Sequence, residues 1–277
     1  MEELITLDYG SGGKKTASLI EKLILPQLDN PALRQLGDGA VVPGGEELVF
    51  STDSFVVSPR FFPGGDIGKL AVCGTVNDIC MSGGEPRWLS LALILEEGLP
   101  AAELEQILSS VAKAAKEAGV CIVTGDTKVV EKGRGDGIYI NTAGIGVLRQ
   151  LGSDLRVLRD PTRGGVATTL CEFVEGTARS ILLEEEAIPV RPAVASACDI
   201  LGLDPLYCAN EGKLLAVVAP ERAEEALALL RGLPEGENAA VIGTVGEQWP
   251  GRVAVRTALG GTRIAAKLAG AQLPRIC

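Results

Sequence analysis

In the first half of the chain, apolar residues recur either at helical spacing or in short continuous runs. The first pattern predicts helices and the second predicts strands. Helical spacing predicts helices over about 16–28, 67–81 and 101–118. Short apolar runs predict strands at 48–51, 88–95, 121–124 and 137–147. The run 67–81 is apolar on nearly every side, which is typical of a buried helix, and Asp66 can cap its first turn. Gly119 is placed to end the third helix.

The alternation of strands and helices resumes near Leu155. Strands are predicted at 155–158, 180–183, 214–218, 240–245 and 253–255, and helices at 164–174, 192–200 and 220–231. No linker rich in proline and serine separates the two halves. We therefore expect an α/β (α+β) protein with an N-terminal domain over 1–147, a C-terminal domain over 148–260 and a flexible tail over 261–277.

The composition is typical of a folded protein. Hydrophobic residues make up 46% of the 277 residues and charged residues 22%, which disfavours a disordered chain. The net charge of -10 disfavours a nucleic-acid partner. The acidic start Met1-Glu2-Glu3 is unlike a secretory signal, and no apolar run reaches membrane-spanning length. We expect a cytoplasmic protein.

Histidine is absent from the sequence, and this narrows the possible chemistry. Histidine-based acid–base catalysis, Ser-His-Asp triads and His-ligated zinc are excluded, so carboxylates, lysines, cysteines or bound metal must act instead. The seven cysteines form no CxxC pair, and the apolar neighbours of Cys73 and Cys121 predict reduced, buried thiols. Cys277 differs because it is the last residue, where a thiol has no packing role.

Four aspartates stand near the ends of apolar segments: Asp38, Asp53, Asp78 and Asp126. Carboxylates in such places suit Mg²⁺ that bridges nucleotide phosphates. One such aspartate alone is more often a turn residue or a helix cap, but four in one domain favour a metal and phosphate site. Asp78 supports the metal and phosphate site further, because it lies on the apolar helix, where an unpaired carboxylate is costly to bury.

Glycine-rich segments are candidates for binding the phosphates. The first of them contains Gly12, Gly13 and Lys14. Its backbone N–H groups can face a phosphate, although it departs from the Walker A pattern. Arg163 and Gly164 precede a predicted helix, whose N-terminus favours an anion. Glu211 and Lys213 stand before a strand, either as site residues or as a surface ion pair.

A set of motifs spread over the chain follows a known pattern. They are 50–59, 61–70, Gly74-Thr75-Val76-Asn77-Asp78, 94–98, 124–130, 160–165, 210–213 and the ending Pro274-Arg275-Ile276-Cys277. Together they resemble the HypE family of hydrogenase maturation proteins. That family belongs to the superfamily of aminoimidazole ribonucleotide (AIR) synthetase, selenophosphate synthetase and thiamine-phosphate kinase. The resemblance implies a two-domain AIR synthase-like fold and a homodimer whose N-terminal domains pair and flank the ATP sites.

The resemblance also implies a reaction on Cys277. This cysteine is expected to accept a carbamoyl group from a HypF-type carbamoyltransferase, and ATP then drives its dehydration to a thiocyanate. The cyanide passes to iron on a HypC–HypD complex, for the [NiFe]-hydrogenase centre. Mg²⁺ is expected on Asp53, Asp78 and Asp126. The base is expected to be Glu211 or Lys128. The nucleotide-binding positions implied are Gly12, Gly13, Lys14, Asp38, Asp53, Asn77, Asp78, Asp126, Thr127, Arg163 and Gly164.

Two departures from the family pattern stand out. Tyr9 occupies the position before the glycine-rich loop where the family usually has histidine. After the strand that ends near Val147, the chain passes directly to the segment before Asp160. The family has a further strand and helix there, so we expect a C-terminal domain shortened by about one βαβ unit.

Two other functions fit parts of the pattern. A small-molecule kinase or synthetase of the same superfamily would not need a terminal thiol, and a non-catalytic scaffold paralogue would keep the thiol without turnover. A last expectation concerns the basic residues of the acid-free stretch 248–277: Arg252, Arg256, Arg263, Lys267 and Arg275. They predict that the tail is attracted to the acidic nucleotide site, in a salt-dependent way.

Overall fold

The computed structural model describes residues 3–10, 14–35, 39–45, 47–148, 154–162, 164–210 and 212–268. The chain divides near residue 150 into two compact units. In the part of the chain that is described, no helix is both long and apolar enough to cross a membrane.

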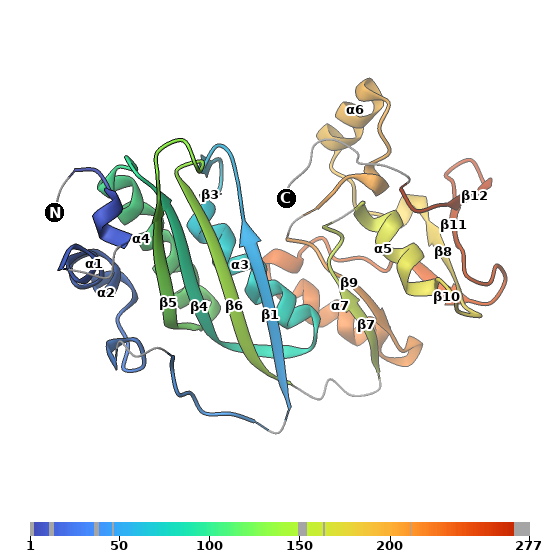
Figure 1. Ribbon diagram of the computed structural model, residues 1–277. Coiled ribbons are helices and arrows are strands. Elements are labelled where there is room, and N and C mark those ends of the chain that lie inside the picture. The colour runs from blue at the N-terminus through green and yellow to red at the C-terminus, as the bar shows by residue number, and fades with distance from the viewer. Residues whose placement is uncertain are drawn as a thin grey trace. The chain divides into compact units, whose positions relative to one another are not determined.

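A four-stranded sheet with strand order β1-β6-β4-β5 is the centre of the first unit (Figure 1). Its strands are β1 (Leu48–Phe55), β4 (Gly84–Glu96), β5 (Cys121–Val130) and β6 (Ile138–Leu148). β6 runs antiparallel to β1 and β4, whereas β4 and β5 are parallel and joined through a helix. Helices α3 (Ile67–Met81) and α4 (Ala101–Ala118) cover one face of this sheet (Figure 1).

Both covering helices have the bounds that the apolar pattern predicts. Asp66 caps α3 by accepting hydrogen bonds from the backbone N–H groups of Gly68 and Lys69. Gly119 ends α4 in the left-handed conformation, at a φ of 69°. The shorter elements are a 3₁₀ turn (Leu7–Gly10), α1 (Lys14–Leu19), a π-helical stretch (Ile20–Ile24), α2 (Leu25–Leu28), a 3₁₀ turn (Leu33–Gln35), β2 (Phe61–Phe62) and β3 (Gly65–Asp66).

Two buried threonines tie α3 to the sheet. The hydroxyl oxygens of Thr75 and Thr142 lie 2.6 Å apart, and the Thr142 hydroxyl donates to the carbonyl of Ala71 at 3.0 Å. A hydroxyl has one hydrogen, so Thr75 is the donor to Thr142. This chain of hydrogen bonds satisfies polar groups inside an otherwise apolar layer and fixes α3 against β6.

The second unit contains a four-stranded sheet in the order β10-β8-β11-β12 and a strand pair, β7-β9. The strands are β7 (Leu155–Arg159), β8 (Ser180–Glu184), β9 (Leu215–Val218), β10 (Gly243–Gly246), β11 (Val253–Arg256) and β12 (Thr262–Ala265). The helices are α5 (Gly165–Val174), α6 (Pro192–Leu201) and α7 (Ala223–Arg231), with 3₁₀ turns at Glu185–Ala187, Pro205–Tyr207, Pro220–Arg222 and Pro234–Gly236.

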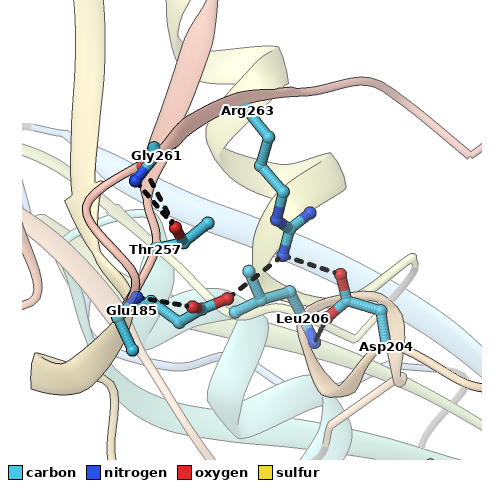
Figure 2. Close-up of polar contacts among 7 residues, drawn as sticks. Glu185, Asp204, Leu206, Thr257, Gly261 and Arg263 are labelled. Atoms are coloured by element: carbon cyan, nitrogen blue, oxygen red, sulfur yellow. Dashed lines mark hydrogen bonds and ion pairs between the residues drawn. The ribbon is translucent and has the colours of Figure 1, made fainter.

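The strand β12 lies inside the segment that the sequence predicts to be a flexible tail. It pairs antiparallel with β11, and its residue Ala265 is buried in the core of the second unit. The connection is a turn in which Thr257 and Gly261 exchange hydrogen bonds (Figure 2). Folded structure therefore extends beyond residue 260, because a tight turn returns the chain along β11.

Three cations of the basic stretch are bound by carboxylates of the second unit. The Arg263 guanidinium lies 2.9 Å from Asp204 Oδ2 and 3.7 Å from Glu185 Oε1 (Figure 2). Arg256 and Lys267 form ion pairs with Glu184 and Glu175, respectively. Their charge is neutralised locally, which disfavours the predicted attraction of the tail to an acidic nucleotide site.

The prediction that the cysteines are buried is wrong for two of them. Cys73 and Cys121 are exposed, whereas Cys171 and Cys198 are buried, and all six described cysteines are free thiols. Cys73 lies on the side of α3 away from the core, and its neighbours Ala71 and Val72 face inward. Apolar sequence neighbours therefore do not determine which way a side chain points.

Candidate functional site

Two of the predicted aspartates lie where α3 packs along the edge strand β1. The Ser51 hydroxyl donates a hydrogen bond of 3.1 Å to Asp78 Oδ2. A Cβ atom on Gly74 would lie 3.9 Å from Asp53 Oδ2, so Asp53 faces the helix. Gly74 and Asp78 are one helical turn apart and share a face of α3. We call this arrangement of Ser51, Asp53, Gly74 and Asp78 the α3–β1 seam.

The sequence predicts that Asp53 follows the end of a strand. It lies within the strand instead, because β1 continues to Phe55. Asn141 on β6 helps to hold this part of β1. Its amide nitrogen donates to the carbonyl of Asp53 at 2.9 Å and to the hydroxyl of Ser54 at 3.0 Å. Sequence reasoning missed Asn141, although a polar residue within the apolar run 138–147 was a usable signal.

Asp126 lies on the opposite face of the sheet from Asp53. In the strand register, Asp53 of β1 lies opposite Thr142 of β6, which faces α3. Asp126 of β5 and Asn141 of β6 both lie opposite Ala92 of β4. Successive residues of a strand point to opposite faces, so Asp126 shares the face of Asn141. That face, which α3 and α4 leave uncovered, is called the open face below.

Asp126 therefore does not share a face of the sheet with Asp53, and the binding of Mg²⁺ by all three aspartates stays a prediction. Among the residues described, no three His, Cys, Asp or Glu side chains lie close enough together to hold a metal ion. The seam still fits Mg²⁺, because the carboxylates of Asp53 and Asp78 are hard oxygen donors. Mg²⁺ with a nucleotide usually takes one or two protein carboxylates, and phosphates and water supply its other ligands.

Asp126 has a lysine as its partner. Lys128 Nζ lies 2.9 Å from Asp126 Oδ1, and the backbone N–H of Thr127 donates to the same oxygen. The hydrogen bond from Lys128, aided by that of Thr127, lowers the pKa of the Asp126 carboxyl below its ordinary value. In this arrangement Lys128, one of the two predicted bases, acts as a hydrogen-bond donor.

Glu96 belongs to the motif 94–98, to which the sequence assigned no role, and it lies at the end of β4. It accepts hydrogen bonds from the backbone N–H groups of Gly133 and Gly137. These bonds lower the pKa of Glu96, although desolvation opposes them. Glu96 therefore fastens the connection between β5 and β6, which is a structural role.

In the second unit, two predicted motifs come together. The backbone N–H of Asn210 donates to the carbonyl of Pro161 at 3.2 Å, which joins the motifs 160–165 and 210–213. Gly164 is the N-cap of α5 at a φ of 68°. Gly165 has a φ of 67°, and a Cβ atom there would lie 2.4 Å from the carbonyl oxygen of Leu206. Only glycine fits at this position.

The remaining predicted residues are dispersed or lie outside the description. Lys14 is exposed at the start of α1, and Asn77 and Thr127 are half-buried on α3 and β5. Tyr9, at the position of the family histidine, is buried, with the ammonium of Lys15 5.6 Å from its ring centre. Outside the described residues lie Gly12, Gly13, Asp38, Arg163, Glu211 and Cys277.

Comparison with known proteins defines the class of this chain. Residues 36–148 match the family model of the N-terminal domain of AIR synthase related proteins, and residues 134–256 match that of the C-terminal domain. The protein is thus an AIR synthase-related protein of two α/β domains, which confirms the predicted fold class.

Individual relatives within that class show the family to which the chain belongs. Carbamoyl dehydratase HypE of Cupriavidus necator is 44% identical, with 99% of this chain and 95% of the relative covered. The crystal structure of hydrogenase maturation protein HypE in complex with ATP is 44% identical and matches with a TM-score of 0.90, over 98% of this chain and 99% of the other. A HypE–HypF complex matches with a TM-score of 0.76 at 40% identity, over 91% and 100%. The chain belongs to the HypE family of carbamoyl dehydratases.

The alignment with the Cupriavidus relative also tests the expected shortening of the chain. It runs over 332 residues, whereas this chain has only 277, so the Cupriavidus relative contains residues without a counterpart here. Both domain models are matched nevertheless. The internal deletion therefore leaves the two-domain organisation recognisable.

Proposed function

We propose that this protein is an ATP-dependent dehydratase that converts the carbamoyl group on its own Cys277 to a thiocyanate. The observation that carries the proposal is the α3–β1 seam, with Asp53 and Asp78, in a chain of the HypE family. The solved relative with ATP supports the same nucleotide for this chain. The product would supply cyanide for the iron of a [NiFe]-hydrogenase.

The chemistry requires activation of a poor leaving group. The carbamoyl oxygen attacks the γ-phosphorus of ATP and ADP leaves. Phosphate then departs from carbon while the nitrogen gives up both protons, so thiocarbamate and ATP become thiocyanate, ADP and phosphate. Asp53 and Asp78 would hold the Mg²⁺ that accompanies the nucleotide, and this cation neutralises phosphate charge. Because Lys128 donates to Asp126, Glu211 is the favoured base.

The test is a mass measurement on the full-length chain. Protein carbamoylated on Cys277 is expected to lose the mass of one water when MgATP is added, with one phosphate released per chain. A non-hydrolysable ATP analogue serves as the control and should leave the carbamoyl mass unchanged. Phosphate release without any loss of mass from the protein would mean that ATP is hydrolysed without dehydration of the thiocarbamate, and it would contradict the proposal.

A HypF-type carbamoyltransferase is the proposed donor of the carbamoyl group, since a HypE relative has been solved in complex with HypF. The proposed acceptor of the cyanide is an iron-carrying HypC–HypD complex. We propose that the reaction takes place in the cytoplasm, which the requirement for ATP supports.

We further propose a homodimer that pairs the open faces of the two first units. Apolar side chains of β1 and β4 lie exposed on this face, with Phe50 67% exposed, Leu48 49% and Ile94 41%. Apolar groups gathered on an uncovered sheet are typical of a protein interface.

The dimer is tested by changing the most exposed of these side chains. Phe50→Asp is expected to give a monomer in sedimentation experiments, because a charge would be buried at the interface. Leu259→Asp, at a side chain that is 99% exposed in the second unit, is the matched control and should leave the mass of the assembly unchanged. A dimer that survives Phe50→Asp would refute pairing through this face.

A further inference from the structure

Helix α6 makes little buried contact with the rest of the second unit. Cys198 is its one buried residue, at 5% exposure, whereas Ile200 is 84% and Leu201 68% exposed. The attachment of the helix therefore depends largely on a single cysteine side chain.

That cysteine faces a second cysteine. The Sγ atom of Cys198 lies 3.9 Å from the Sγ atom of Cys208, which follows the 3₁₀ turn Pro205–Tyr207. The two sulfurs of a disulfide are about 2.0 Å apart, so the atoms need to approach by roughly 2 Å. Because most of α6 is exposed, the helix can move by this distance without disrupting the core.

Cys208 is also connected to the two motifs that meet in this unit. Its carbonyl accepts a hydrogen bond of 2.6 Å from the side-chain amide of Asn210, and the backbone N–H of Asn210 binds Pro161. A Cβ atom on Gly165 would lie only 2.7 Å from the same carbonyl oxygen. A displacement of Cys208 is therefore transmitted directly to the segments around Pro161 and Asn210.

We propose that Cys198 and Cys208 are a modification site, where exchange with a low-molecular-weight disulfide such as oxidised glutathione forms a reversible disulfide that fastens α6 to the segment carrying Asn210. This site goes beyond the dehydratase function. Its existence does not depend on Cys277 or on ATP, so the two proposals stand or fall separately.

The exchange proceeds in two balanced steps. The Cys208 thiolate attacks one sulfur of oxidised glutathione, forms a mixed disulfide and releases one glutathione thiolate. The Cys198 thiol then loses its proton and attacks the Cys208 sulfur, which releases the second glutathione. Two protein thiols are oxidised, and one glutathione disulfide is reduced to two thiols.

Cys208 is the first thiol to react because it is the more accessible of the pair. Burial, with smaller contributions from Cys198 and Asp204, raises the pKa of Cys208, and Lys213 opposes this change. Little thiolate is present at neutral pH as a result, and the exchange is best followed in mildly alkaline buffer.

The experiment uses the full-length chain with Cys73→Ser, Cys121→Ser and Cys277→Ala, so that the exposed thiols and the terminal thiol do not compete. Oxidised glutathione is expected to remove the mass of two hydrogens without leaving a glutathione adduct, and peptide mapping should join residues 198 and 208. Dithiothreitol should restore the original mass. In this background, Cys198→Ser should instead retain one glutathione on Cys208, and Cys80→Ser is the control that still forms the bond.

Hydrogen exchange measures the consequence for the helix. The backbone amides of 192–201 should exchange several-fold more slowly in the oxidised protein than in the reduced protein. This protection should disappear in Cys198→Ser and in Cys208→Ser. A stable glutathione adduct on Cys208 with Cys198 present, or a disulfide between other cysteines, would overturn the proposed site. Unchanged exchange of α6 after the disulfide has formed would overturn the fastening.

Discussion

Cys277→Ala protein is expected to bind MgATP with unchanged affinity and to accept no carbamoyl group at all. The loss is complete because the proposed reaction takes place on the sulfur itself, and no other atom of the residue can replace it. Intact mass spectrometry after incubation with the carbamoyltransferase measures the outcome, and calorimetry measures nucleotide affinity.

Cys73→Ala and Cys121→Ala are the matched controls for this experiment. Both thiols are exposed, so they test whether accessibility alone is enough for carbamoylation. Each control should be modified to the same extent as the unchanged protein. Carbamoylation of the Cys277→Ala chain would refute the assignment of the terminal cysteine.

Asp78→Asn is expected to weaken MgATP binding by about tenfold or more, which corresponds to about 1.4 kcal/mol. The substitution removes the negative charge that would face the cation, whereas the amide oxygen can still accept the hydrogen bond from Ser51. The fold should therefore survive, with an unchanged circular dichroism spectrum. Asp53→Asn is expected to act in the same direction.

Asp136→Asn, in the connection between β5 and β6, is the control for charge removal. It takes one negative charge from the same unit and is expected to leave the nucleotide affinity unchanged. Equal affinities for the Asp78→Asn and unchanged chains would reassign Asp78 to the packing of α3 against β1.

The helices of the first unit were predictable because local signals specify them. An apolar run with a capping aspartate gave the bounds of α3, and an amphipathic run before a glycine gave those of α4. The ends of β1 were not predictable in this way. The strand continues through Asp53 because β6 supplies hydrogen-bond partners as far as Phe55, and that pairing is formed by residues far apart in sequence.

The candidate site was predicted in its residue types but not in its arrangement. Asp53 and Asp78 approach the same seam, as the motif pattern suggested. Asp126 does not, because the register of β5 on β4 places it on the other side of the pleat. A shift of one residue in that register would reverse its direction, and no local sequence signal reports such a shift. The return of the chain into β12 was missed for a similar reason.

The side chains of Asp53 and Asp126 point to opposite faces of the sheet. This has a consequence for whether a nucleotide site in a dimer draws its residues from one chain or from both. In a dimer formed through the open faces, Asp126 lies on the interface side of its sheet, whereas Asp53 lies on the helix-covered side. A nucleotide that uses both aspartates would then draw them from different chains. Two defective chains, one altered at Asp53 and one at Asp126, would complement each other when mixed, because each mixed dimer regains one intact pair. Independent sites within each chain would show no such rescue.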